Sequence, residues 1–221
     1  MALIFRSDDK KFRKKVLDNV RRSYRSTYPK IRNSLKTFLT EQLKTEFYAN
    51  KTVDSISNGI LKGELGLTTP EANLEAILQK MISTINITVS APADLKTIMS
   101  IRLEAVRDDF QDLLALGAAT QDWTDRQNKE VRGEPLPWLE WLLLEGNNVI
   151  VADFRVTHKK GLGRSGELAI MEPVDGSFWR VPPSYQGTIT DNFILDIVVK
   201  VKKEMNKRVW QIVRRVIAQL S

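Results

Sequence analysis

Residues 161–193 read GLGRSGELAIMEPVDGSFWRVPPSYQGTITDNF and hold five of the eleven glycines and three of the eight prolines of the chain. Glycine adopts backbone conformations that are closed to other residues, and Asp175-Gly176 is a turn signal between two short apolar runs. We therefore expect a β-hairpin formed by Glu167–Glu172 and Phe178–Val181. The second strand should end at Pro182-Pro183, because proline has no N–H to donate to a sheet ladder.

The residues that follow predict one long helix. Thr190 or Asp191 can cap its first turn. Apolar side chains then recur at spacings of three and four, at Ile194, Val198, Val201, Met205, Val209, Ile212, Val216 and Leu220. A helix of about 30 residues would be roughly 45 Å long. A second apolar edge, which includes Trp210, makes its apolar face wider than one neighbour requires, so we expect part of the helix to pack between subunits.

Three other segments alternate apolar and polar residues, namely residues 85–89, 99–105 and 150–156. A period of two predicts strands with one exposed face. Together with the hairpin, these segments predict an α+β fold with a four- to five-stranded antiparallel or mixed sheet, covered by helices on one face. A short helix, Trp138–Glu145, should end at Gly146, and Gly117–Glu134 has the polar composition of an exposed loop.

The N-terminal third of the chain predicts helices. A first helix should begin after Ser7, and Pro29 separates it from a second helix that ends near Asn50. Two further helices are expected, one over Val53–Lys62 that ends at Gly63 and one that begins at Thr69-Pro70. We divide the chain into a basic helical arm or hairpin, residues 1–50, and an α+β core domain with the long C-terminal helix, residues 51–221.

Positive charge is concentrated at the N-terminus. The chain has a net charge of +7, but residues 1–36 contain twelve Lys and Arg and three Asp, a balance of +9, which leaves −2 for the rest. In the first helix, apolar residues recur every fourth residue as a narrow stripe between cationic faces, at Phe12, Val16, Val20 and Tyr24. Three interpretations stay open: a solvated helix packed on its own domain, an arm that contacts another subunit, and direct contact with DNA.

The composition excludes several classes of protein. The absence of cysteine excludes disulfides and cysteine-containing metal sites. The longest apolar run, Trp141–Leu144, is far shorter than a membrane span, and the N-terminus is charged where a signal peptide is apolar. We expect no membrane partner, and a protein that stays in the cytoplasm until it joins an assembly.

The candidate catalytic groups do not form a convincing site. His158 is the only histidine, and its basic neighbours favour a surface residue over a catalytic partner of Ser165. Four carboxylates could hold a divalent cation if one helix carried them all, but Glu104 falls in an expected strand, apart from Asp108, Asp109 and Asp112.

Two other motifs also favour a structural interpretation. The Gly161–Gly166 loop lacks the Gly-Lys-Ser/Thr ending of a phosphate-binding loop. Trp138, Trp141 and Trp179 could stack on bases, but the helical spacing of the first two beside leucines favours a core or a subunit interface. We therefore expect no enzymatic activity, no cofactor and no metal.

A resemblance to a known family extends over about residues 133–200. It is carried, in this order, by Leu136-Pro137-Trp138-Leu139-Glu140-Trp141-Leu142-Leu143, Arg164-Ser165-Gly166, Ala169-Ile170-Met171, Trp179, Val181-Pro182, Gly187-Thr188 and Asp191-Asn192-Phe193-Ile194. In order and spacing this run resembles the neck or tail-completion components of tailed-bacteriophage virions. The first 130 residues carry none of its motifs.

The resemblance implies a non-enzymatic virion protein, located in the neck or tail and present in the host cytoplasm during assembly. It implies a ring of identical subunits at the head–tail junction, typically sixfold or twelvefold, between the portal or connector and the tail. A neck adaptor and a tail terminator ring both stay open. The expected subunit contacts are Phe12, Arg13, Val20, Arg21, Arg164, Trp179, Pro182, Trp210 and Arg214. The alternative is a basic nucleic-acid-binding protein that uses residues 10–36, and a ring subunit would also be open to non-specific contact with genomic DNA.

Overall fold

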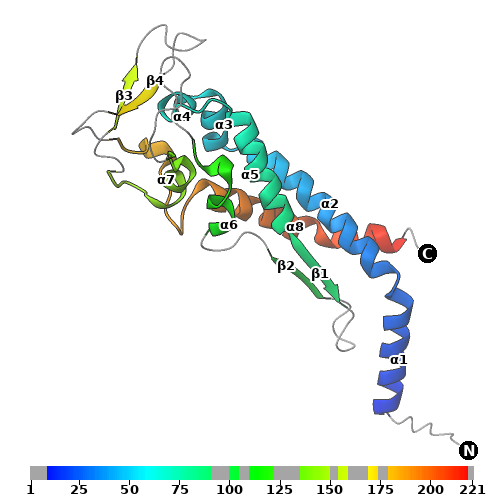
Figure 1. The fold of residues 1–221 in the computed structure, drawn as a ribbon. Helices are drawn as coiled ribbons and strands as arrows, with labels where there is room; N and C mark the ends of the chain where they lie inside the picture. Colours follow the sequence, from blue (N-terminus) through cyan, green and yellow to red (C-terminus); the bar gives the residue numbers. More distant parts are fainter. Residues whose placement is uncertain are drawn as a thin grey trace, which may run out of the picture. The chain divides into compact units, whose positions relative to one another are not determined.

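The computed structural model describes residues 9–90, 100–104, 110–121, 135–149, 154–158, 169–173 and 179–218 (Figure 1). Eight α-helices, two short 3-10 helices and four strands lie in these ranges. The contacts divide the chain into two compact units. Unit 1 consists of residues 1–41, 85–105 and 203–221, and unit 2 consists of residues 42–84 and 106–202.

The expected four- to five-stranded sheet is wrong, because the described part of the chain is predominantly helical. Its strands form two separate antiparallel pairs, β1 (Asn86–Ser90) with β2 (Ser100–Glu104), and β3 (Phe154–His158) with β4 (Ala169–Pro173). Among the described residues, each strand pairs with one other strand. The alternation of apolar and polar residues predicted where the strands occur. It did not predict how many strands would share one sheet.

The hairpin predicted within residues 161–193 is also wrong in its pairing. Its first strand exists as β4, but β4 pairs back with β3, in the register Phe154 opposite Pro173 and His158 opposite Ala169. Residues 174–178, which include the Asp175-Gly176 turn signal, lie outside the described residues. A turn signal between two apolar runs therefore did not identify the partner of the strand before it.

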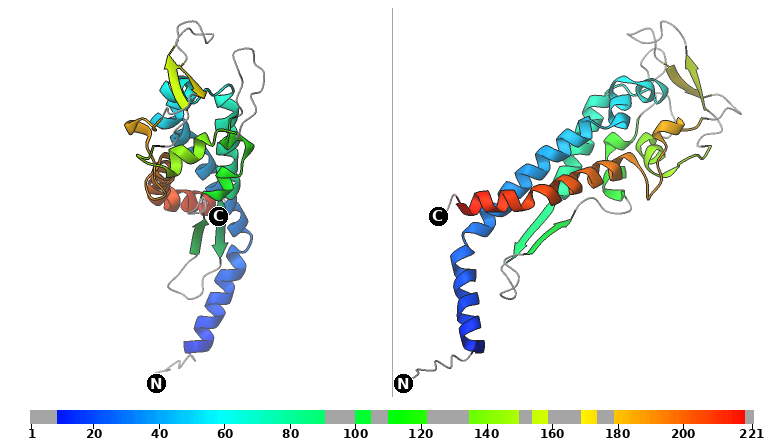
Figure 2. Two further views of the ribbon diagram at one scale, coloured as in Figure 1. Left: turned by 60° about the vertical axis from the view of Figure 1, so that its left-hand side comes forward. Right: turned by 180° about the vertical axis from the view of Figure 1, so that it is seen from behind.

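Unit 1 contains α1 (Asp9–Tyr24), the N-terminal half of α2 (Thr27–Tyr48), the β1–β2 pair and the C-terminal half of α8 (Phe193–Ala218). Pro29 lies in the first turn of α2, where a missing N–H costs no helical hydrogen bond, so the predicted break between the first two helices is confirmed. Figures 1 and 2 show the C-terminal half of α8 lying beside α2. The buried apolar residues of the unit are Ile31, Leu35, Leu39, Ile87, Met205, Val213 and Val216.

Unit 2 is a helical assembly around α5 (Pro70–Thr84), which begins at the predicted proline. This helix packs against α3 (Lys51–Asn58), α6 (Gln111–Leu114) and the 3-10 turn Gly117–Ala119, while β4 lies against α4 (Ile60–Glu64). The buried side chains of α5 are Leu74, Ile77, Leu78 and Met81, at the helical spacing read from the sequence. The unit also contains α7 (Trp138–Leu144), the 3-10 turn Pro183–Tyr185, the end of α2 and the start of α8.

Glycines explain where three of these helices end. Gly146 has φ +57 directly after α7, which confirms the predicted end of that helix. The single third helix predicted over Val53–Lys62 is instead split into α3 and α4 at Gly59, and Gly63 is a buried residue inside α4. The terminating glycine is Gly66, with φ +62.

The split at Gly59 follows from the close approach of its backbone to the preceding turn of α3. A Cβ at residue 59 would lie 2.8 Å from the Cα atom of Ser55. The Ser55 Oγ atom accepts a hydrogen bond from the Leu61 N–H group at 3.2 Å, which satisfies a donor in the first turn of α4. Helix α4 can therefore begin directly after Gly59.

Replacing Gly59 with alanine should lower the free energy of unfolding by about 1–3 kcal/mol, a typical cost of overpacking. Urea denaturation followed by circular dichroism measures the change. Gly117→Ala is the matched control, because no atom lies within 4 Å of a Cβ built at Gly117. It should alter stability by less than about 0.5 kcal/mol, and equal stability of the two variants would contradict the close contact at Gly59.

Candidate functional site

Most residues of the family resemblance that the structure describes lie in unit 2 where α7 meets the segment before α8, while residues 169–171 lie in β4. The rings of Trp141 and Trp179 lie with their centroids 5.6 Å apart. Trp179 is buried, and its indole Nε1 donates a hydrogen bond to the Glu64 carboxylate at 3.1 Å. This pair joins the helix α7 to α4 through a residue that sequence reasoning placed at a subunit contact.

A second contact in the same region involves Gly187. A Cβ at this position would collide with the Leu142 carbonyl oxygen and would lie 2.7 Å from the Cβ atom of Asn192. The Gly187 carbonyl accepts a hydrogen bond from the Gly146 N–H group at 2.8 Å. Only a glycine lets the chain pass this close to the end of α7.

Asn192 caps α8, although the sequence predicted Thr190 or Asp191 for this role. Its Oδ1 atom accepts from the Leu195 N–H group at 3.1 Å, and its Nδ2 atom donates to the Thr188 carbonyl at 2.8 Å. An amide side chain both accepts and donates, whereas a carboxylate such as Asp191 only accepts. The buried Asn192 can therefore satisfy the helix and the preceding loop together, and those predicted caps are corrected by one or two residues.

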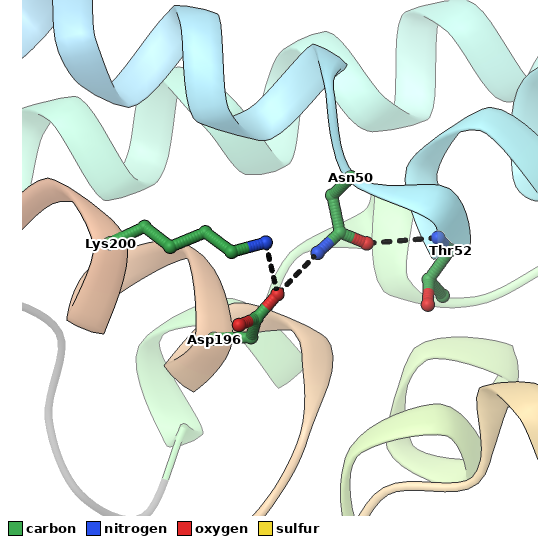
Figure 3. Close-up of polar contacts among 4 residues, drawn as sticks. All are labelled: Asn50, Thr52, Asp196 and Lys200. Carbon is green, nitrogen blue, oxygen red and sulfur yellow. Dashed lines mark hydrogen bonds and ion pairs between the residues drawn. The ribbon is translucent and has the colours of Figure 1, made fainter.

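The polar cluster of Asn50, Thr52, Asp196 and Lys200 connects the start of α3 to the first turns of α8 (Figure 3). The Asn50 Oδ1 atom accepts from the Thr52 N–H group at 2.9 Å, which makes Asn50 the N-cap of α3. Its Nδ2 atom donates to Asp196 Oδ2 at 3.2 Å, and Lys200 Nζ donates to the same oxygen at 2.8 Å. The hydrogen bond to Asp196 raises the pKa of Lys200 above its ordinary value.

This cluster was not predicted from the sequence, because its members are 146 positions apart. The only local signal was Asn50 before a helix, a residue type that favours N-cap positions. Asn50 is buried, and both ends of its amide are occupied by the contacts described. The cluster therefore positions the start of α3 against the first turns of α8.

The other candidate groups do not come together in the described residues. His158 lies in β3, while Ser165 and the Gly161–Gly166 loop lie outside the described residues. Glu104 lies in β2 of unit 1 and Asp112 in α6 of unit 2, and Asp108 and Asp109 are outside the described ranges. Within those ranges there is no group of three or more metal-ligating side chains.

The predicted contact residues fall into two sets, one in each unit. Phe12, Arg13, Val20 and Arg21 lie on α1, while Trp210 and Arg214 lie on α8, all in unit 1. Arg21 forms an ion pair with Asp18 at 3.5 Å. Trp179 and Pro182 belong to unit 2, where Pro182 is half-buried. Arg164 lies outside the described residues and stays a prediction.

Unit 1 exposes large apolar side chains on its helices. The side chain of Phe12 is 59% exposed and that of Trp210 is 55% exposed. Arg13 and Arg214 are exposed on the same two helices. Exposed aromatic side chains next to arginines are typical of the anchor residues of interfaces.

The separation of charge between the units was missed by reading the sequence in order. Unit 1 contains 19 Lys and Arg and 7 Asp and Glu, a balance of +12, while unit 2 contains 15 and 20, a balance of −5. The N-terminal 36 residues account for +9 of the first value, and the C-terminal residues 203–221 add +4. Only the fold shows that these two basic segments belong to one unit.

Comparisons with known proteins give no relative: no family model, no curated protein and no solved structure matches this chain. In the part of the chain that the structure describes, none of the helices combines the length and the apolar character needed to cross a membrane.

The Asn50 cluster predicts two related effects on stability. Asn50→Ala removes the cap of α3 and the contact with Asp196, and should lower the free energy of unfolding by about 1–2 kcal/mol. Asn50→Asp keeps an acceptor for Thr52 but sets a second carboxylate against Asp196, so this variant should regain stability as the pH falls and either carboxylate is protonated.

Thermal unfolding at neutral and mildly acidic pH measures both effects. Asn206→Ala is the matched control, because Asn206 is an exposed residue in the middle of α8. Wild-type stability in Asn50→Ala would show that the cluster does not hold α3 to α8.

Proposed function

We propose that this chain is a non-enzymatic structural protein of a tailed-bacteriophage virion, which assembles with copies of itself into a ring at the head–tail junction. In this role it would link the connector to the tail as a neck or tail-completion component. A tail terminator ring is the closest alternative within the same class, because both are ring-forming proteins at one junction.

The observation that carries the proposal is that several residues of the family resemblance pack against one another. Trp141, Trp179, Gly187 and Asn192 are separate in the sequence, yet they form one packed arrangement between α7 and the start of α8. A resemblance built on such mutually dependent residues supports a shared local structure. If the same four residues lay on the surface without contacting one another, the resemblance could be a coincidence of sequence.

The described residues also favour assembly over catalysis. The cap of α8, the indole pair and the Asn50 cluster are all occupied by contacts within the chain. An exposed feature is instead the aromatic side chain of Phe12 on α1. A ring requires a heterologous contact that repeats from one subunit to the next until it closes, and the α1 stripe offers one partner for such a contact.

The mass of the purified protein in solution, measured by light scattering at low and moderate salt, tests the proposal. A particle of about six or twelve chains is the expected result for a closed ring. A single chain at the highest concentration reached, together with no binding to virions that lack their tails, would overturn it.

Phe12→Glu should weaken assembly, because it places a charge in the apolar stripe of α1. We expect at least a tenfold rise in the concentration needed to form the particle, which corresponds to about 1.4 kcal/mol. Ile60→Glu is the matched control, since Ile60 is a large apolar residue of unit 2 that is 57% exposed, close to the 59% of Phe12. Equal masses for wild type and Phe12→Glu across a dilution series would exclude α1 as an assembly surface.

A further inference from the structure

One face of the C-terminal half of α8 carries a regular row of cations around a tryptophan. Lys203, Lys207, Trp210 and Arg214 follow one another at spacings of four, three and four, and all four side chains are exposed. Residues at this spacing share one side of a helix. The opposite side of α8 is buried through Met205, Val213 and Val216. The cationic row, which we define by these four exposed residues, therefore faces solvent.

Acidic neighbours neutralise little of this charge. Glu204 is the only acidic residue between residues 203 and 221. It pairs with Lys207 at 2.6 Å and with Arg208 at 3.9 Å, and the hydrogen bond from Lys207 holds the pKa of Glu204 below its ordinary value. Lys203, Arg214 and Arg215 form no ion pair with any of the described residues.

The rest of unit 1 adds charge of the same sign. Helix α1 carries seven Lys and Arg and two Asp. The first turns of α2 expose Lys30, Arg32 and Lys36, while the side chains that they flank, Ile31 and Leu35, are buried. The whole unit has a balance of +12. A field of this size attracts a polyanion over any neutral partner.

We propose that unit 1 binds the phosphodiester backbone of nucleic acid, and that the cationic row of α8 is part of the contact surface. This inference does not rest on the proposed function, because it uses only the charge and exposure of unit 1. It replaces the subunit contact that the sequence suggested for Trp210 and Arg214.

The dimensions of the row agree with such a partner. Lys203 and Arg214 are eleven residues apart, which is about 17 Å along a helix. Duplex DNA presents about ten phosphates over that length. The exposed indole of Trp210 between Lys207 and Arg214 adds a flat surface on which an unpaired base can stack.

The same observations disfavour the two other polyanionic partners. A helix that binds a bilayer surface needs a broad apolar face, and the cationic row contains one apolar side chain, Trp210. The core of a protein interface is depleted of lysine, whereas Lys203 and Lys207 are exposed on the same side of the helix as the only aromatic residue of the row. Nucleic acid is the partner that needs neither an apolar face nor an uncharged core.

The experiment measures binding of the full chain to a fluorescent duplex of mixed sequence and to its single strand, by anisotropy over a range of KCl concentrations. We expect affinity that falls linearly in a log–log plot of binding constant against salt, the signature of counterion release. The triple variant Lys203→Ala, Lys207→Ala and Arg214→Ala removes the three cations of the row, and it should reduce that slope by up to about 3 and lower the affinity at least about tenfold.

A triple variant of unit 2 with the same change in charge is the matched control. It combines Lys51→Ala, Lys80→Ala and Arg180→Ala, all outside unit 1, and should keep the wild-type slope. Light scattering measures the mass of both triple variants. If the masses are equal, a loss of affinity does not come from a smaller number of binding chains in each particle. Trp210→Ala separates the two forms of nucleic acid, because a stacking indole contributes to the single strand and not to the duplex.

Two results would overturn the proposal. Equal loss of affinity in the two triple variants would mean that the charge of the whole chain, and not the surface of unit 1, is responsible. Binding to anionic lipid vesicles without binding to either oligonucleotide would assign the row to a membrane surface. A selective loss in the α8 variant, with an unchanged mass, supports the proposal.

Discussion

The close approach of Gly187 to the end of α7 is the constraint on which the described part of unit 2 depends. Because no Cβ fits between Gly187 and the Leu142 carbonyl, the chain can pass there only as glycine. This passage delivers Asn192 to the point where its amide both closes the preceding loop and caps α8. The first turn of α8 then brings Asp196 within hydrogen-bond distance of Asn50. One steric condition thus fixes where the longest helix begins and which other helix it is tied to.

The helix α8 has two chemically different halves. Its first ten residues, Phe193–Lys202, belong to unit 2, and its last sixteen, Lys203–Ala218, belong to unit 1. The first half is held by buried apolar residues and by the Asn192 and Asp196 contacts. The second half keeps a buried apolar side but exposes the cationic row. The point at which the charge changes along α8 is therefore also the boundary between the two units.

Sequence patterns predicted most helices of this chain because helical contacts are local. The period of the apolar residues, Pro29 and Pro70 in first turns, and Gly146 after α7 all act within a few residues of the chain. The strands were found for the same reason, but the number of strands that share a sheet is set by contacts between distant segments. No local pattern showed that β4 returns to β3 or that the two hairpins stay separate.

In the candidate site too, individual residues could be identified from the sequence, but their contacts with distant residues could not. Trp179 and Gly187 could be singled out from composition, but their partners Glu64 and Leu142 could not. Asn50 and Asp196 meet across 146 positions, and the charge of unit 1 is the sum of segments from both ends of the chain. What could be read from the sequence was the chemistry of each residue. The structure was needed to show which distant residues contact one another or belong to the same unit.

The two proposals are linked by electrostatics. A unit with a balance of +12 repels copies of itself, and the repulsion is greatest at low ionic strength, where the screening length is long. A ring that brought several such units close together would carry this cost at every interface. A bound polyanion would neutralise part of the charge and favour the same assembly by mass action. Nucleic-acid binding by unit 1 and ring formation therefore do not compete: the first would remove the main electrostatic obstacle to the second.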